Sequence, residues 1–286
     1  MSKQLNSISG FSSLLTNVRH MPTTGVELEV RSNNIKTKDF SWTTAFNLSH
    51  NKNKILKLAD LPWFVDGRYV RKEGYPFNTI YLREYAGVDP ETGSALYYDN
   101  QQDENGNYTK NKVTDTGQAS PIPLKDITPT ISGGFMNTFN YKFIDLSFNL
   151  SYSFGGYSYD NASYILQDDG YSVISNKSTE QRRRWQKPGD ITDVPRFVYG
   201  NKKGGNYNSS RAIHSTDHIR LKSLILGLNA PKAWLQKLGI GNARIYFSGT
   251  NLLTWAAYDQ YDPEMSGVVG FYTPPLKTYA FRLDRI

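Results

Sequence analysis

One stretch of the chain alternates apolar and polar side chains without a break. Between Phe143 and Phe154, the even positions are all large and apolar, and the odd positions are Asp145 followed by Ser and Asn. Successive side chains of a strand point to opposite faces, so the pattern predicts a strand with one apolar and one polar face. At about a dozen residues, it is roughly twice as long as a usual globular strand. That length suits a strand that crosses a bilayer at a tilt.

The same alternation recurs and predicts seven long strands. They are expected at residues 25–31, 40–50, 131–141, 143–154, 217–229, 242–252 and 276–285. In the fifth strand the pattern is less regular, because its leucines would share a face with Arg220 and Lys222. We therefore expect an all-β fold, an antiparallel transmembrane β-barrel segment of about seven spanning strands from a larger barrel.

The connections between these strands are either short or very long. Residues 141–143 predict a tight turn, and residues 230–241 predict a helical turn opened by Pro231. Residues 51–128, 155–216 and 256–275 are long and polar, and residues 79–85 and 95–98 are expected to pair as a hairpin. Outer-membrane barrels combine short periplasmic turns with long extracellular loops, so we place the long connections outside. The alternative is a soluble, secreted carbohydrate-binding β-sandwich, although compact domains rarely contain such long loops.

The sequence offers little for catalysis or metal binding. It has no cysteine, so thiolate sites are excluded. His214 and His218 have a spacing that chelates zinc on a helix, but on an extended segment they stand about 13 Å apart. The acidic residues lie in separate turns, which gives no carboxylate pair for glycoside hydrolysis. We expect no enzyme activity, catalytic residue, metal or cofactor; a loose calcium site at Asp99 and Asp103, with Glu104, or at Asp168 and Asp169, stays open.

The charge balance also bears on partners. The formal net charge is +7, and Arg182, Arg183 and Arg184 form a short basic run beside Trp185. Phosphate binding needs a basic surface that extends further than one isolated run, so no nucleic-acid partner is expected.

Aromatic side chains are frequent in the long outer connections. Aromatic faces and nearby polar groups are the usual lining of small-molecule sites, and loops often carry binding residues. The candidates for contact with substrate or partner are Trp63, Tyr69, Tyr81, Tyr85, Tyr157, Tyr164, Tyr171 and Trp185. Packing of the loops against themselves is the alternative role for each.

Several motifs, in order along the chain, resemble the SusC/RagA family of TonB-dependent (TonB-linked) outer-membrane transporters. The clearest are Asp89-Pro90-Glu91-Thr92-Gly93, Ser248-Gly249-Thr250-Asn251-Leu252-Leu253-Thr254-Trp255 and Tyr261-Asp262-Pro263-Glu264. Within them, the resemblance implies a structural role for Asn251, Leu252, Thr254, Trp255, Asp262, Pro263 and Glu264.

The resemblance implies that residues 1–286 are the C-terminal part of the receptor β-barrel, with the plug domain absent from this chain. It implies the cell outer membrane of a Gram-negative, Bacteroidota-like bacterium, and active import of oligosaccharides or similar nutrients, with a glycan or peptide as substrate. The implied partners are a SusD-like surface lipoprotein, outer-membrane lipid, and the TonB complex, reached through the missing N-terminal part. A non-functional truncated remnant of such a transporter is a further alternative.

Overall fold

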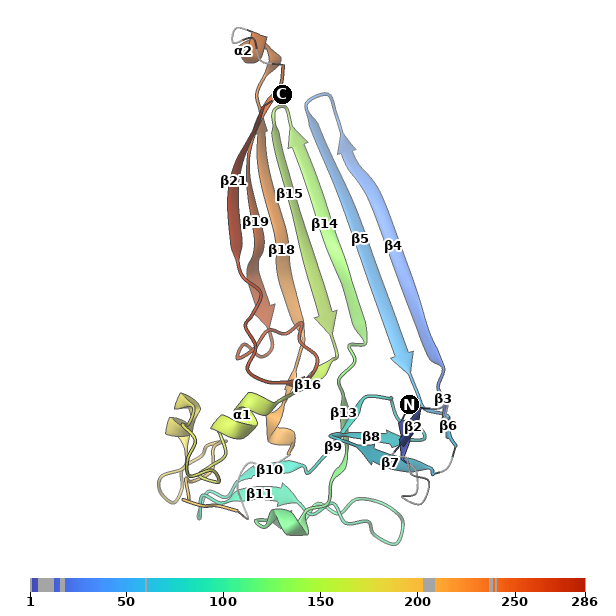
Figure 1. Cartoon of the computed structure of the whole chain (residues 1–286), viewed down its shortest axis with the longest axis vertical. Coiled ribbons are helices and arrows are strands. Elements are labelled where there is room, and N and C mark those ends of the chain that lie inside the picture. The colour runs from blue at the N-terminus through green and yellow to red at the C-terminus, as the bar shows by residue number, and fades with distance from the viewer. Residues whose placement is uncertain are drawn as a thin grey trace.

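Seven antiparallel strands form one long, twisted sheet. The computed structural model describes residues 2–4, 13–15, 19–59, 61–202, 209–236, 239 and 241–285. The strand order is β21-β19-β18-β15-β14-β5-β4, and the strands run side by side along the molecule (Figure 1). Their bounds are β4 Thr23–Lys36, β5 Phe40–Asn53, β14 Ile131–Tyr141, β15 Ile144–Phe154, β18 His218–Asn229, β19 Ala243–Ala256 and β21 Thr278–Arg285. The seven predicted strands and their antiparallel pairing are confirmed.

The register of the sheet separates an apolar face from a polar face. One row across the sheet contains Trp42, Phe139, Leu146, Leu226, Phe247 and Phe281, and the next contains Thr43, Thr138, Ser147, Ile225, Ser248 and Ala280. Much of the apolar face is uncovered, since Phe281 is 81% exposed and Val26 is 65% exposed. The other sheets are short and lie in the connections, so no second large sheet packs against this face in the described chain. The β-sandwich alternative is therefore wrong.

A β-bulge at Lys222 explains the irregular pattern of β18. Ser223 lies opposite Asn149 and Leu221 lies opposite Leu150, so Lys222 is an extra residue between them. The extra residue reverses the alternation. Arg220 therefore lies opposite Ser151 on the polar face, and the expectation that it shares a face with the leucines is wrong.

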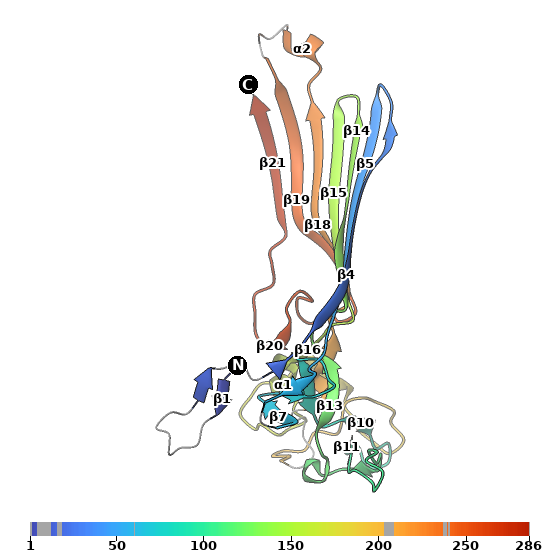
Figure 2. The ribbon, with the colours of Figure 1, turned by 90° about the vertical axis from the view of Figure 1, so that its right-hand side faces the viewer.

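The long connections fold into small sheets at one end of the long sheet. They contain β6 Lys57–Leu58, β7 Trp63–Asp66, β8 Tyr69–Lys72, β9 Thr79–Leu82, β10 Tyr85–Val88, β11 Ala95–Tyr98, β12 Lys112–Val113, β13 Ile122–Asp126, β16 Tyr157–Asp160, β17 Ile213–Ser215 and β20 Gly267–Val269. The N-terminal region adds β1 Ser2–Gln4, β2 Ser13–Leu15 and β3 Arg19–His20. We call these connections the loop end; it lies at the bottom of Figures 1 and 2.

The predicted hairpin between residues 79–85 and 95–98 is wrong in its first strand. β9 lies between β8 and β13, so both of its edges are already paired. The strand that pairs with β11 is β10, and the short turn of the Asp89-Pro90-Glu91-Thr92-Gly93 motif joins them.

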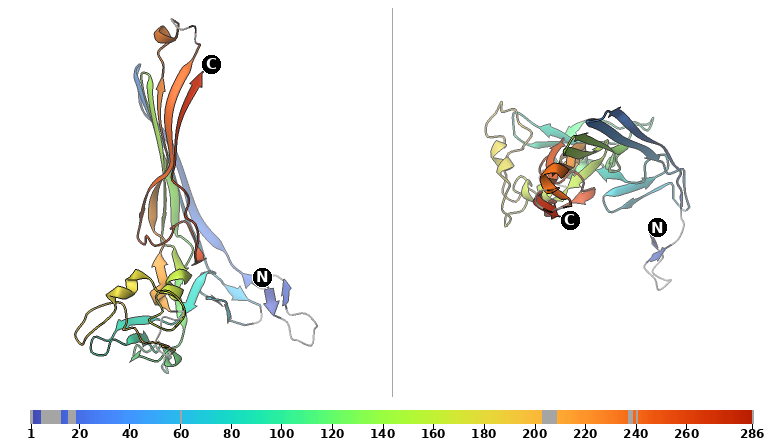
Figure 3. Two further views of the ribbon diagram at one scale, coloured as in Figure 1. Left: turned by 60° about the vertical axis from the view of Figure 1, so that its left-hand side comes forward. Right: turned by 90° about the horizontal axis from the view of Figure 1, so that it is seen from above.

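The loop end has its own buried core, and short helices complete the fold. One buried cluster joins the first long connection, residues 51–128, to the second, residues 155–216. Its members are Ile80, Leu82, Tyr159 and Ala212. The helices among the described residues are α1 Asn161–Leu166, η2 Thr116–Gln118, η3 Thr179–Arg183, η4 Ser210–Ala212 and α2 Lys232–Gln236. As predicted, α2 follows Pro231, and it lies at the end of the sheet away from the loop end (Figure 3). Within the described residues, no helix is long and apolar enough to cross a membrane.

Candidate functional site

A charged cluster lies where β18 meets the connection between β19 and β21. Arg220 donates hydrogen bonds to Asp262 Oδ2 at 2.7 Å and to Glu264 Oε2 at 3.0 Å. Lys222 Nζ lies 2.6 Å from the same Glu264 oxygen, and His218 Nε2 lies 3.8 Å from Oε1. The side chains of Arg220 and Asp262 are only 3% and 6% exposed. Because buried charges are costly unless they are paired, these contacts hold the connection on the polar face of β18.

The Asn251 motif forms a second irregularity, directly beside the first. Asn251 has a φ of +53°, which Asn tolerates better than most residues, and it lies with Leu252 between two paired positions of β19. Its side-chain amide donates to the Leu276 carbonyl at 3.3 Å, near the start of β21. Beyond this bulge, Thr254 lies opposite Arg220 on the polar face, and Trp255 lies on the apolar face, 56% exposed.

Tyrosines and a buried carboxylate connect this region to α1. Asp160 accepts hydrogen bonds from the Ser163 amide at 2.9 Å and from the Tyr258 hydroxyl at 2.9 Å. The Tyr261 hydroxyl forms a hydrogen bond with the Ser158 hydroxyl, and burial raises the pKa of Tyr261 to about 12. His214 stacks on Tyr258 with ring centroids 3.7 Å apart, and burial lowers its pKa. These hydroxyl groups therefore act as neutral hydrogen-bond partners near neutral pH.

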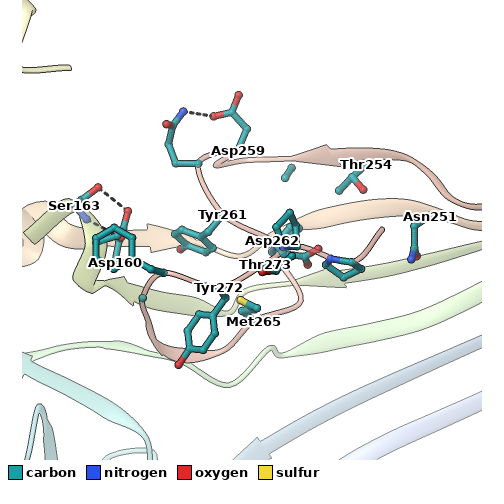
Figure 4. A pocket seen from close by; sticks show the side chains of 18 of the residues that line it. Asp160, Ser163, Asn251, Thr254, Asp259, Tyr261, Asp262, Met265, Tyr272 and Thr273 are labelled. Carbon is teal, nitrogen blue, oxygen red and sulfur yellow. Dashed lines mark hydrogen bonds between the residues drawn. The ribbon is translucent and has the colours of Figure 1, made fainter. Parts of the chain in front are cut away.

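Some residues of each of these three groups line one cavity of about 1050 Å³ (Figure 4). Asp160 and Ser163 lie on one side, Asn251 and Thr254 lie on the opposite side, and Tyr261 and Asp262 lie between them. The walls combine charged, hydroxyl and aromatic groups, a mixture that suits binding of a polar ligand. The predicted motif residues Asn251, Thr254, Trp255, Asp262 and Pro263 all line this cavity.

The eight aromatic candidates lie in different parts of the loop end. Tyr69 and Tyr164 pack against the buried core cluster, and Tyr85 packs against Tyr97. Tyr157 has the Lys125 ammonium 5.0 Å from its ring centroid, and Tyr171 is 36% exposed. Trp63 and Tyr81 face each other with ring centroids 6.1 Å apart. This last pair lines one cleft together.

Trp185, the eighth candidate, joins the two long connections. Its indole Nε1 donates to the Pro90 carbonyl at 2.8 Å, and a Cβ on Gly93 would lie 2.3 Å from its ring. The Arg196 amide donates to the Gly93 carbonyl at 2.8 Å. This contact gives the Asp89–Gly93 motif a physical role that the sequence did not show.

Arg211 and Asp169 form a buried ion pair that the sequence did not predict. The side chains are 11% and 0% exposed, and Asp169 also accepts a hydrogen bond from Gln181 at 3.0 Å. Burial raises the pKa of Asp169. The sequence singled out Asp169 for calcium, but the cation facing it is Arg211, and Lys177 pairs with Asp168.

The remaining polar candidates also have partners within the loop end. Asp99 accepts hydrogen bonds from Thr109 and Asn111, and Asp103 accepts them from the amides of Asn105 and Asn107. In the basic run, Arg183 pairs with Glu180 at 2.8 Å and with Asp193 at 3.4 Å. In the part of the chain that the structure describes, no three His, Asp or Glu side chains gather as a metal site.

Comparison with known proteins identifies relatives that match most of the chain. The chain is 33% identical over 280 residues to TonB-dependent receptor P3 of Formosa agariphila. This match covers 92% of the chain and 27% of the receptor. It is 26% identical over 297 residues to TonB-dependent receptor SusC of Bacteroides thetaiotaomicron, covering 96% of the chain and 27% of SusC. The predicted resemblance to SusC-like TonB-dependent receptors is confirmed. No family model matches the chain.

Part of the solved structure of the RagAB peptide transporter has the same fold as this chain. It superposes on 98% of the chain with a TM-score of 0.86 and 29% identity, and the chain covers 31% of the solved chain. The predicted β-barrel segment is therefore confirmed. The chain spans less than a third of the length of these relatives, which are named as receptors and transporters.

Proposed function

We propose that this chain is the C-terminal wall and outer-loop part of an outer-membrane active transporter. The observation that carries the proposal is the exposed apolar face of the seven-stranded sheet, which lipid would cover. In the described chain, β4 and β21 are the outermost strands of that sheet. Their free edges need further strands, because unpaired backbone groups are not satisfied in lipid. The plug and the remaining strands would come from the rest of the protein.

The transported substrate would be an oligosaccharide or a similar nutrient, and TonB would supply the energy. The names of the relatives support the dependence on TonB. The cavity beside Asp262 has polar and aromatic walls suited to a polar nutrient such as an oligosaccharide. Uptake of the cognate nutrient should require both the full-length transporter and TonB. Equal uptake in a strain without TonB would contradict the energised mechanism, whereas loss of uptake in that strain supports it.

The orientation of the wall is tested separately with spin labels. Labels at Leu146, Phe148 and Leu150 in the full-length protein should contact lipid, and labels at Ser147 and Asn149 should contact water. Their accessibility to oxygen and to a water-soluble nickel reagent distinguishes the two environments. Equal accessibility of the two sets would contradict a membrane wall.

A SusD-like surface lipoprotein is the proposed partner, and the second long connection offers a surface for it. Ile174 and Ile191 are 93% and 98% exposed, and Tyr199 is 78% exposed. Exposed apolar side chains that gather into one patch are typical of interaction sites, and we propose that these three contribute to such a patch. Replacing both isoleucines by Ser should weaken capture of the lipoprotein. The control is Leu61→Ser, since Leu61 is 61% exposed in the other long connection; equal loss in both variants would contradict this surface.

A further inference from the structure

A second cleft lies in the first long connection, apart from the cavity beside Asp262. Its volume is about 440 Å³, and its walls include Trp63, Lys72, Tyr81, Gln101, Gln102 and Tyr108. Trp63 is on β7, Lys72 is on β8 and Tyr81 is on β9, three neighbouring strands of one small sheet (Figure 1). The segment that links β11 to β13 supplies the glutamines and Tyr108.

The strand pairing and a loop bond shape this cleft. Trp63 lies opposite Lys72 in the β7–β8 pair, and its ring lies 6.1 Å from that of Tyr81 at an angle of 49°. Trp63 is 46% exposed, so much of its indole surface is accessible to a ligand. On the other side, Gln101 Nε2 donates to Ser120 Oγ at 3.1 Å, which anchors that wall.

The chemistry of the walls indicates the kind of ligand. Two angled aromatic rings offer apolar faces, while the amides, the Tyr108 hydroxyl and the Lys72 ammonium offer hydrogen bonds. Among the described residues that line the cleft, none is acidic. A peptide with an ammonium terminus or basic side chains would lack a counter-charge there. A sugar ring, which has apolar C–H faces and a rim of hydroxyls, matches both kinds of group.

We propose that the Trp63–Tyr81 cleft is a subsite that binds sugar units of an oligosaccharide. The inference rests on the proposed nutrient import and specifies its substrate class. Trp63 and Tyr81 provide the stacking faces, and the glutamine amides and Lys72 orient the hydroxyl groups. The subsite would capture the glycan at the loop end before it reaches the barrel lumen.

The test is binding of the full-length transporter, purified in detergent, to an array of defined neutral and acidic oligosaccharides and to a pool of short peptides. Trp63→Ala and Tyr81→Ala should each weaken the strongest glycan signal by about tenfold or more, the usual loss at an aromatic binding anchor. Trp63→Phe should retain most of it. Trp234→Ala is the matched control, because Trp234 is 65% exposed on α2 at the other end of the sheet. Detergent gel filtration confirms that each variant is folded.

Three outcomes would overturn the subsite: no glycan binding by the unmodified protein, binding of peptides alone, or glycan binding that is unchanged in Trp63→Ala and Tyr81→Ala. Uptake is scored in parallel in cells with and without TonB. A transporter that imports a nutrient through TonB yet binds no glycan would refute the subsite and leave the proposed function standing. Glycan binding that depends on Trp63, without TonB-dependent uptake, would support the subsite and refute the proposed function.

Discussion

At the scale of single residues, Gly93 is one of the positions where the two long connections meet. Its φ is +69°, and any Cβ would overlap the Trp185 ring. Gly93→Ala should therefore separate the connections, and hydrogen exchange at the Trp185 and Arg196 amides should rise. Gly106→Ala is the control, because Gly106 has a φ of +79° with nothing within 4 Å of a Cβ. Both changes cost about 1–2 kcal/mol from the left-handed backbone, so equal exchange in both would contradict the contact.

His214 should make the loop end sensitive to acid. Burial against Tyr258 lowers its pKa below the ordinary value of 6.5, and nearby Asp160 opposes this only in part. The folded protein therefore binds a proton at His214 less tightly than the unfolded chain does. The free energy of unfolding consequently decreases as the pH falls below about 6.5. Protease cleavage around β17 should increase between pH 7.5 and 5. His214→Phe keeps a ring on Tyr258 and should reduce this increase; the same increase in that variant would argue against His214.

At the scale of elements, the bulge at Lys222 decides which side of the wall Arg220 faces. Deleting Lys222 would restore strict alternation and turn Arg220 onto the apolar face, away from Asp262. Arg220 is the third residue of β18 and lies close to the loop end, where a cation on the lipid face costs only about 0–1 kcal/mol. The larger effect is that the buried Asp262 would lose its partner. We expect the full-length protein to fail in outer-membrane assembly, as judged by heat-modifiable gel mobility. Lys222→Gln keeps the bulge and should assemble; failure of both variants would assign the defect to the charge instead.

At the scale of the whole molecule, the sheet is an open segment. β4 and β21 each have one edge without a strand partner in the described chain, and the apolar face is exposed. Expressed alone, residues 1–286 should aggregate or require detergent, and should not resist heat or trypsin as a closed barrel does. Sedimentation and limited trypsin digestion measure this. A monodisperse soluble monomer with cooperative unfolding would contradict the expectation.

The sequence by itself determined the seven strands and, apart from the bulged part of β18, their two faces. Alternation is a local property, because each side chain points to the opposite side from its neighbour whatever the strand pairs with. The pattern from Ile144 to Phe154 was therefore sufficient to predict β15, and the sharp change at Lys142, with a φ of +52°, was visible as a short turn. The aromatic content of the outer connections could also be predicted, but their arrangement could not.

Only the tertiary structure decided which distant residues meet. Arg220 forms an ion pair with Asp262, 42 positions later in the chain. The Trp185 indole donates a hydrogen bond to the carbonyl of Pro90, 95 positions earlier. In sequence, Arg220 was merely a charge that broke the alternation, and Asp262 belonged to a motif without a visible partner. The pairing of β10 rather than β9 with β11 has the same origin, since β9 is already enclosed by β8 and β13. Such contacts depend on how long connections fold back in space, and that folding is set by burial and pairing across the whole loop end rather than by any local pattern.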